Sequence, residues 1–511
     1  MTDHKPHAPA RRGPVLVVAA LLLGALAPAR AGAEEAAPAA PAAPAAPTAP
    51  ADTGASEVQP GVIEHGQAIE ALRLGANLQA AHYAWASITR STPSADKYEG
   101  AQFALAEALS RLGFEQAAAE YYFEVARNRR TPALLPRALA GLDQLARRGL
   151  VAEDKLMRGV LVEADLGDLS DEVADFVHYY QGLADLRSGL GRWVDHDFDQ
   201  VKPDGYYANQ ARYVRAVARL QAGDGAGALK LVDELLGKNP DRLTEARARL
   251  TRARLLYEAK RIDEALAEYL RVKKSNAIPM GEILLERAWS RFRAGAYHDA
   301  MGLLYSLVAP SNRDLFLPEQ YILRGLIYQR FCHFRAAKAA VADFRRRYGA
   351  PIRELRAGKL PQTVVQVRRA ALERPEVMPH DRLYRAVADE RAKVEKMRKA
   401  LLKGGLYDHL KKMYDSLEVQ AGRTVNAALR SGARNAAEQI LESEEQANLL
   451  EYEVGVAIFR RVTDSSGRGL LRAPAEKVPT GGPRTYYRFD GEFWTDELPD
   501  MRFLIQDRCV E

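Results

Sequence analysis

One short pattern recurs along most of this 511-residue chain and constrains its fold more than any other feature. A small residue, usually alanine, precedes an aromatic or aliphatic residue by four positions, and in half of the clear copies it follows a glycine by five. Successive anchors of the pattern lie 37, 110, 37, 35 and 37 residues apart, and 110 is close to three periods. We therefore expect two degenerate copies within the long interval and about eight units in all. The anchors are Ala81, Ala118, Ala228, Ala265, Ala300 and Ala337.

Each unit resembles the tetratricopeptide repeat (TPR), a helix-turn-helix of about 34 residues with small residues at fixed positions. In the best-matching unit, Ala216, Ala228 and Pro240 fall at the positions where the repeat carries alanine, alanine and proline, and Gly223 lies at the turn. Small residues let two helices cross closely, and larger ones fill the space to the next pair. The resemblance implies an all-α, TPR-like α-solenoid with a concave docking surface. A generic helical bundle is the alternative.

The first 60 residues indicate export. The apolar run over residues 15–27 is 13 residues long, which is too short to span a bilayer but typical of a signal-peptide core. Small residues suited to cleavage follow it at Ala31 and Ala33, and no cysteine is placed there to accept a lipid. We expect a cleavable signal peptide over 1–33 and an unlipidated periplasmic protein. A buried apolar helix is the alternative interpretation.

The remaining chain divides by composition. Residues 34–60 are rich in alanine and proline and predict a disordered linker, although a proline-rich ligand for a partner is also open. Residues 61–350 hold the solenoid, and residues 351–462 predict long helices broken at Gly404 and Gly405. In the first of these helices only Glu390 interrupts the heptad spacing of the apolar positions, which are Leu383, Val387, Val394, Met397 and Leu401.

Charge is uneven in this helical region. Residues 343–412 contain 19 lysines and arginines against 9 aspartates and glutamates, whereas residues 431–453 contain one arginine and six glutamates. The basic stretch is a candidate contact for anionic lipid, a cell-wall polymer or an acidic protein. A solvated helix face paired with the acidic stretch is the structural alternative. We expect no nucleic-acid partner, because no stacking or zinc-finger pattern accompanies the basic residues.

Residues 463–511 have an irregular sequence that is rich in aromatic residues, from which we expect a small irregular or β segment. It either packs on the end of the solenoid, which is the safer prediction, or forms an exposed tail that contacts a partner through Phe493 and Trp494. The two cysteines, Cys332 and Cys509, allow at most one disulfide. Cys332 lies in an apolar helical stretch as a small core residue, and its pairing with Cys509 stays open.

No catalytic motif is present. The chain lacks a phosphate-binding loop, a zinc-protease motif, a nucleophile elbow and a paired CxxC motif. Asp195, His196 and Asp197 are adjacent acidic and imidazole side chains, but neighbours on one short stretch rarely converge on a metal. We expect no enzyme activity, no cofactor and no metal.

The resemblance also names candidate contact residues. In the TPR family the first helix of each pair lines the concave groove, and aromatic and arginine side chains suit interaction hot spots. Carried onto the matching positions of this chain, the family pattern implies partner binding by Arg247, Arg254, Tyr257, Trp289, Phe292, Arg293, Gln329 and Arg330. The same side chains could instead cover packed helices.

The order of signal peptide, spacer, repeats, basic helices and aromatic tail resembles periplasmic TPR proteins of gliding proteobacteria, in particular those of the adventurous gliding motility (Glt) machinery. This resemblance implies a non-catalytic scaffold in a trans-envelope complex that links inner- and outer-membrane components. Adaptors for outer-membrane protein assembly or cell-wall synthesis share the same plan, and an envelope enzyme with a TPR recruitment domain is a weaker alternative.

Overall fold

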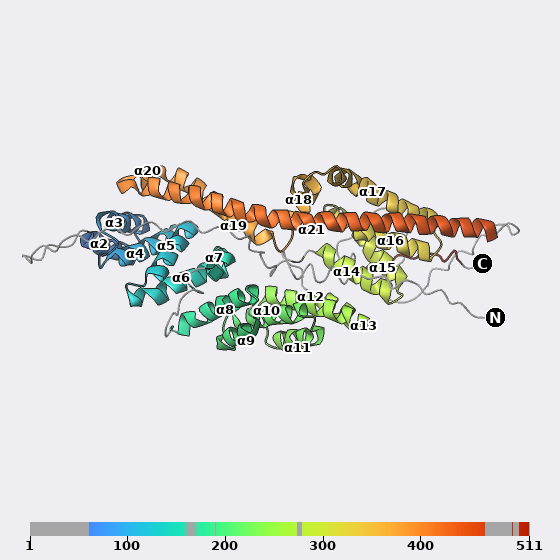
Figure 1. Cartoon of the computed structure of the whole chain (residues 1–511), viewed down its shortest axis with the longest axis horizontal. Helices are drawn as coiled ribbons and strands as arrows, with labels where there is room; N and C mark the ends of the chain where they lie inside the picture. Colours follow the sequence, from blue (N-terminus) through green and yellow to red (C-terminus); the bar gives the residue numbers. More distant parts are fainter. Residues whose placement is uncertain are drawn as a thin grey trace, which may run out of the picture. The chain divides into compact units, whose positions relative to one another are not determined.

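The computed structural model describes most of the chain from residue 61 onward (Figure 1). The described ranges are 61–158, 171–189, 191–272, 280–464 and 500–509, with four single residues between them. The predicted signal peptide and linker lie outside these ranges, as does most of the aromatic C-terminal segment. Two compact units are present and are described separately. Among the described residues, the N-terminal unit contains 61–208 and 379–425, and the C-terminal unit contains 209–378, 426–464 and 500–509.

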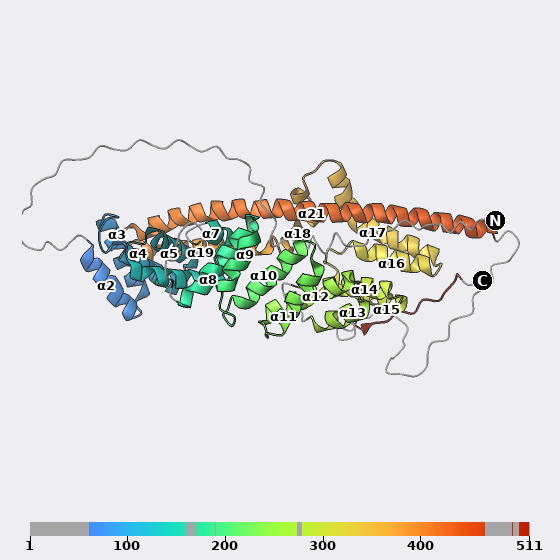
Figure 2. The ribbon, with the colours of Figure 1, turned by 60° about the horizontal axis from the view of Figure 1, so that its bottom comes forward.

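The N-terminal unit consists of helix pairs that follow one another along the chain (Figure 2). Its helices before residue 208 are α2 (Val62–Arg73), α3 (Asn77–Arg90), α4 (Tyr98–Arg111), α5 (Glu115–Asn128), α6 (Leu135–Arg147), α7 (Glu153–Arg158), α8 (Asp171–Arg187) and α9 (Gly191–Gln200). A left-handed glycine at Gly75, Gly113 and Gly149 makes the turn after α2, α4 and α6. The later helices α19 (Met378–Lys396) and α20 (Arg398–Leu401) complete the unit together with the first part of α21 (Leu406–Asp464).

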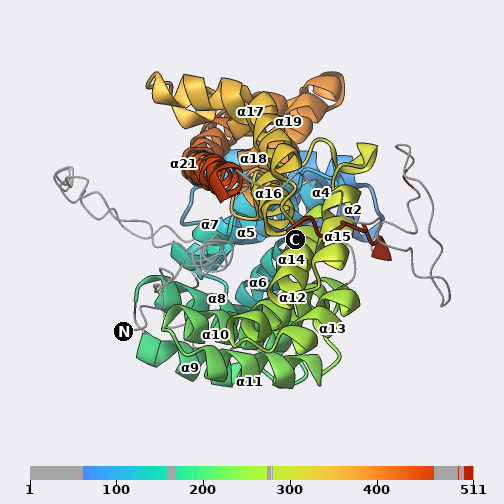
Figure 3. The same ribbon diagram turned by 90° about the vertical axis from the view of Figure 1, so that its right-hand side faces the viewer.

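The C-terminal unit repeats the same arrangement (Figure 3). Its paired helices are α10 (Ala208–Gln221), α11 (Gly225–Leu236), α12 (Arg242–Glu258), α13 (Ile262–Arg271), α14 (Met280–Arg293), α15 (Tyr297–Ser306), α16 (Glu319–Arg330) and α17 (Phe334–Arg356). The short α18 (Val365–Leu372) and the second part of α21 pack beside the last pair.

The helix pairs confirm the predicted TPR-like α-solenoid fold class. Each of the six anchor alanines is fully buried on the second helix of a pair, where a larger side chain would separate the helices. The two degenerate copies expected after Ala118 are the pairs α6/α7 and α8/α9, and Val194 of α9 is buried at an anchor position. Within the described residues, the chain thus forms eight consecutive pairs.

Two features of the last helices were only partly expected. The predicted break is present, because Gly404 and Gly405 adopt left-handed backbone angles between α20 and α21. In contrast, α17 continues through the buried Pro351 to residue 356, so the predicted boundary at residue 350 falls inside a helix. α21 is one continuous helix of 59 residues. Across the described residues, even helices of this length lack an apolar stretch sufficient to cross a membrane.

Part of the basic stretch pairs with the acidic stretch inside the C-terminal unit. Arg345 on α17 lies 2.5 Å from Glu451 on α21, and Arg356 lies 2.6 Å from Glu444. Both pairs are partly exposed, so each adds little to the stability of the fold. These contacts support the paired-helix alternative for this part of residues 343–412, and they leave lipid or polymer binding by the remaining residues as a prediction.

Residues 500–509 pack onto the C-terminal unit, which agrees with the safer of the two predictions for this part of residues 463–511 (Figure 3). Residues 500–509 contain no β-strand, and the backbone N–H of Phe503 donates to the carbonyl of His298 at 3.0 Å. The Phe503 ring stacks on Tyr305 at 4.2 Å between centroids, and Ile505 is buried. A disulfide joins Cys509 to Cys332, which resolves the open question of their pairing.

Candidate functional site

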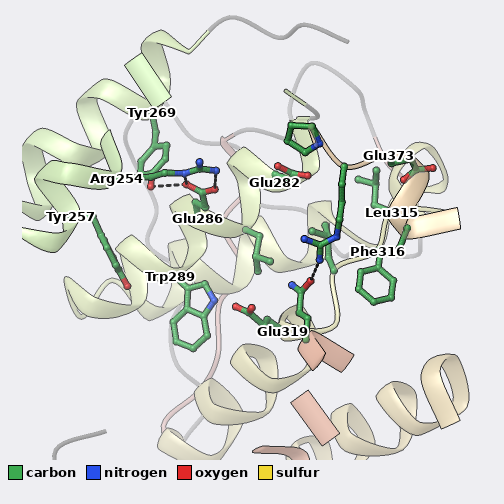
Figure 4. A pocket seen from close by; sticks show the side chains of 16 residues that line it. Arg254, Tyr257, Tyr269, Glu282, Glu286, Trp289, Leu315, Phe316, Glu319 and Glu373 are labelled. Carbon is green, nitrogen blue, oxygen red and sulfur yellow. Dashed lines mark hydrogen bonds and ion pairs between the residues drawn. The ribbon is translucent and has the colours of Figure 1, made fainter. Parts of the chain in front are cut away.

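A cavity of about 140 Å³ lies in the C-terminal unit between the first helices of three consecutive pairs (Figure 4). Helices α12, α14 and α16 supply most of its charged and aromatic side chains, and the segment after α18 and one residue of α21 complete the wall. First helices of stacked pairs line the concave side of a solenoid. The cavity therefore occupies the place where a TPR-like stack presents its binding surface.

An ion pair at one side of this cavity connects two repeats. Arg254 of α12 donates from Nε and Nη2 to the two carboxylate oxygens of Glu286 on α14, at 3.0 and 2.6 Å. The Tyr269 hydroxyl donates to the same carboxylate at 2.8 Å. Arg254 and Tyr269 are only 5% and 3% exposed, so this bidentate pair is shielded from water and fixes α14 against α12 and α13.

Two further carboxylates line the cavity without an ion pair. Glu282 on α14 and Glu319 on α16 form no salt bridge with any residue that the structure describes. Burial raises the pKa of Glu282, and the positive charge of Arg254 offsets only part of this effect. Burial likewise raises the pKa of Glu319, against a smaller opposing effect from Gln439 and Trp289. Burial therefore disfavours the charged form of both carboxyls as long as no cation joins them in the cavity.

One polar group on the aromatic side chains is unsatisfied. The hydroxyl of Tyr257 is buried and makes no hydrogen bond with the described residues. The buried indole N–H of Trp289 lies close enough to the Glu319 carboxyl to lower its pKa. Figure 4 shows Trp289 and Glu319 next to one another, with Tyr257 on the adjoining helix. A buried donor without an acceptor costs free energy, which a bound group can recover.

Arg374 stands on the opposite side of the cavity. Its guanidinium donates to Gln439 of α21 at 3.0 Å and lies 3.7 Å from Glu376. The neighbouring Glu373 lies 3.7 Å from Arg369. Taken together, the lining holds four carboxylates and two guanidiniums, and both guanidiniums already have partners within the protein.

The structure brings together some of the residues predicted for partner binding. Arg254, Tyr257 and Trp289 line the cavity. Phe292 packs edge-to-face on Trp289, and the exposed Arg293 places its guanidinium 4.3 Å from the centre of the Tyr257 ring. All five side chains come from α12 or α14.

Other predicted residues lie elsewhere. Arg247 is exposed on α12 and does not line the cavity. Gln329 donates to Glu453 of α21 at 3.4 Å, and Arg330 lies 5.7 Å from the centre of the Tyr297 ring. Phe493 is half-buried, whereas Trp494 lies outside the described residues. Binding of a partner by any of these side chains remains a prediction.

The carboxylates of the cavity were missed at the sequence level although a signal for them existed. Glu282 and Glu319 occupy the same repeat position as Arg247, 35 and 72 residues further along the chain. The predicted contact residues were aromatic, arginine and glutamine side chains and did not include these two acidic positions. Glu373 and Arg374 follow the last repeat and carry no repeat signal at all.

A second cavity, of about 360 Å³, lies in the N-terminal unit beside α5 and α19. Its charged residues Glu120 and Lys155 bond to one another. Within the described residues, no group of three or more histidine, cysteine, aspartate or glutamate side chains could hold a metal ion.

Residues 219–277, from the end of α10 to just beyond α13, match the tetratricopeptide repeat family. This part of the chain is similar to TPR proteins. This match covers α12, which carries Arg254 and Tyr257, and the helix pairs on both sides follow the same plan. TPR domains bind protein partners, and their all-helical fold is typical of non-catalytic interaction scaffolds. No curated protein matches the chain.

Proposed function

We propose that this protein is a non-catalytic TPR scaffold that holds a segment of a partner protein against α12, α14 and α16. The observation that carries the proposal is the cavity where three consecutive repeats present buried polar groups next to aromatic rings. Such a surface offers the anchoring aromatic contacts and the desolvated polar contacts that dominate binding energy at protein interfaces.

The proposed location is the periplasm. A short apolar run followed by small residues supports cleavage and export of the chain. The disulfide between Cys332 and Cys509 supports the same location, because disulfides persist in oxidising compartments and are rare in the cytosol.

The proposed process is assembly of a trans-envelope complex, with the gliding motility machinery as the first candidate. The order of sequence segments supports this choice through its resemblance to periplasmic TPR proteins of gliding proteobacteria. Envelope proteins of the inner and outer membrane would then be the partners.

Crosslinking in cells, followed by affinity purification of the tagged protein from envelope fractions, tests this function. Recovery of motility and envelope-spanning components is the expected result, and replacement of Trp289 and Arg293 by alanine should reduce it. Lys230→Ala is the matched control, since Lys230 is exposed on α11, a second helix, and does not line the cavity.

The identity of the captured proteins decides between processes. Recovery of outer-membrane insertion factors or wall-synthesis factors would show that the protein is an adaptor in one of these processes and not a motility component. Capture of no envelope protein would contradict the scaffold function. Circular dichroism of the double variant must match that of the unmodified protein, because Trp289 also packs against the core of the last repeats.

A further inference from the structure

The charge of the cavity identifies the chemistry of its ligand. Four carboxylates and two guanidiniums line it, and Arg254 and Arg374 are each engaged by side chains of the protein. Glu282 and Glu319 are left without a cationic partner among the described residues. An anionic peptide, such as a C-terminal carboxylate, would meet no unengaged cation in this lining, because both guanidiniums already have partners.

The aromatic side chains narrow the choice among cations. Tyr257, Trp289 and Phe316 border the cavity beside the carboxylates. A guanidinium is planar, stacks on aromatic faces and forms paired hydrogen bonds with carboxylates, whereas an ammonium is a compact and strongly hydrated point charge. Arg254 already uses this bidentate geometry with Glu286 in the same cavity.

The unpaired hydroxyl of Tyr257 indicates that the cation belongs to a polypeptide. A guanidinium has no acceptor, so it cannot satisfy this hydroxyl. A backbone carbonyl beside an inserted side chain can accept from it. A peptide segment therefore supplies the positive charge and the acceptor at once.

We propose that the cavity between α12, α14 and α16 binds an arginine side chain presented by an extended segment of a partner protein, with Glu282 and Glu319 as its counter-charges. This inference rests on the proposed function, because it names the chemistry of the partner at the same site. Trp289 stacks on the guanidinium, and the Tyr257 hydroxyl donates to the backbone of the segment.

A test uses the full exported chain with its disulfide intact, immobilised and exposed to pools of labelled pentapeptides. Each pool has randomised flanks and one fixed central residue, which is arginine, lysine, norleucine or glutamate. The arginine pool should be retained at least about tenfold better than the norleucine and glutamate pools, since truncating a buried charge contact weakens binding by that factor or more.

Substitutions of the cavity carboxylates test whether retention of the peptides depends on the cavity. The double variant Glu282→Gln and Glu319→Gln should lose retention of the arginine pool by about tenfold, because it keeps the shape and removes the charge. Glu234→Gln, on the exposed face of α11, should leave retention unchanged. Circular dichroism confirms that each variant is folded, and the two single variants replace the double variant if it is not.

Protonation gives an independent readout. Because burial raises the pKa of both carboxyls above the ordinary value, retention of the arginine pool should fall as the pH is lowered, before exposed carboxylates become protonated. The norleucine pool should show no such fall. The charged and polar groups that face the two carboxyls are Arg254, Glu286, Glu373 and Arg374 for Glu282, and Glu286, Trp289, Gln439 and Glu442 for Glu319.

Equal retention of the arginine and norleucine pools would overturn the proposal, as would equal retention of arginine and lysine or an unchanged result with the double variant. These failures leave the scaffold function intact if envelope partners are still captured in cells. Loss of partner capture by the unmodified protein would instead contradict the function itself.

Discussion

Glu390 is a buried carboxylate in the N-terminal unit, on the face of α19 that packs against its neighbours. It is 8% exposed and accepts hydrogen bonds from the Tyr414 hydroxyl and from the backbone N–H of Gln116, the latter at 3.0 Å. Burial raises the pKa of Glu390 to about 7, although these two donors and Lys393 oppose the shift and Glu115 adds to it. The residue that interrupts the heptad spacing thus joins α19 to α5 and α21.

The raised pKa predicts that this unit loses stability as the pH rises. Below about pH 4.5 Glu390 is protonated in both the folded and the unfolded chain, so it makes no pH-dependent contribution. Between about pH 4.5 and 7 the folded state binds more protons than the unfolded state, and the free energy of unfolding falls. Glu390→Gln keeps the acceptor oxygen and should stabilise the protein by on the order of 1 to 3 kcal/mol at pH 8.

Urea unfolding at pH 4 and pH 8 measures this effect. The increase in the free energy of unfolding caused by Glu390→Gln should appear at pH 8 and vanish at pH 4. Asp389→Asn is the matched control, since Asp389 is the exposed neighbour on the same helix. An equal gain at both pH values would show that packing and not ionisation is responsible.

At the scale of elements, the anchor alanines set the distance between paired helices. Ala265 of α13 is fully buried against α12, within a cluster that includes Ala253, Leu256 and Tyr269. Ala265→Leu adds three carbon atoms where no space exists and should destabilise the C-terminal unit by about 1 to 3 kcal/mol through overpacking.

Chemical denaturation compares this variant with Ala267→Leu, which places the same side chain on the exposed face of the same helix. The control should change the free energy of unfolding by less than about 0.5 kcal/mol. Similar unfolding midpoints for both variants would contradict the register of the repeats.

The fold was predictable because close helix crossing leaves a periodic trace of small residues. Even the degenerate pairs α6/α7 and α8/α9 could be inferred from the spacing of the anchors around them. The passage of α17 through Pro351 could not, because local propensity disfavours proline within a helix. Here Tyr348 and Ile352, on either side of the buried Pro351, pack in one cluster with residues of α21, and this packing overrides that preference.

The site was predictable only in part. Arg254, Tyr257 and Trp289 were inferred from their repeat positions, and the cavity contains all three. Its acidic character depends on Glu282 and Glu319, whose burial follows from packing against the segment after α18 and against α21. Those elements lie outside the repeat pattern, so periodicity alone could not predict the environment of the two carboxyls.

At the scale of the whole chain, one covalent bond joins distant parts of the sequence. The disulfide connects Cys332, after α16, with Cys509, and the two residues are 177 positions apart. Near this bond, the segment that contains Met501 packs closely on α15. A Cβ added at Gly302 of α15 would lie 1.9 Å from the carbonyl oxygen of Met501. Such close contact leaves no room for the segment to shift while the bond is intact.

Reduction of this disulfide should therefore destabilise the C-terminal unit by about 2 to 5 kcal/mol, because cross-linking so long a loop restricts the unfolded chain strongly. Calorimetry with and without dithiothreitol measures the loss, and Cys509→Ser should reproduce it and make the protein insensitive to the reductant. The reduced form should also lose residues 500–509 first to limited proteolysis, since Phe503, Ile505, a few hydrogen bonds and two partly exposed ion pairs then hold them without a covalent bond. An unchanged melting temperature after both thiols are titrated would show that non-covalent packing alone fixes the end of the chain, and that the bond adds no stability.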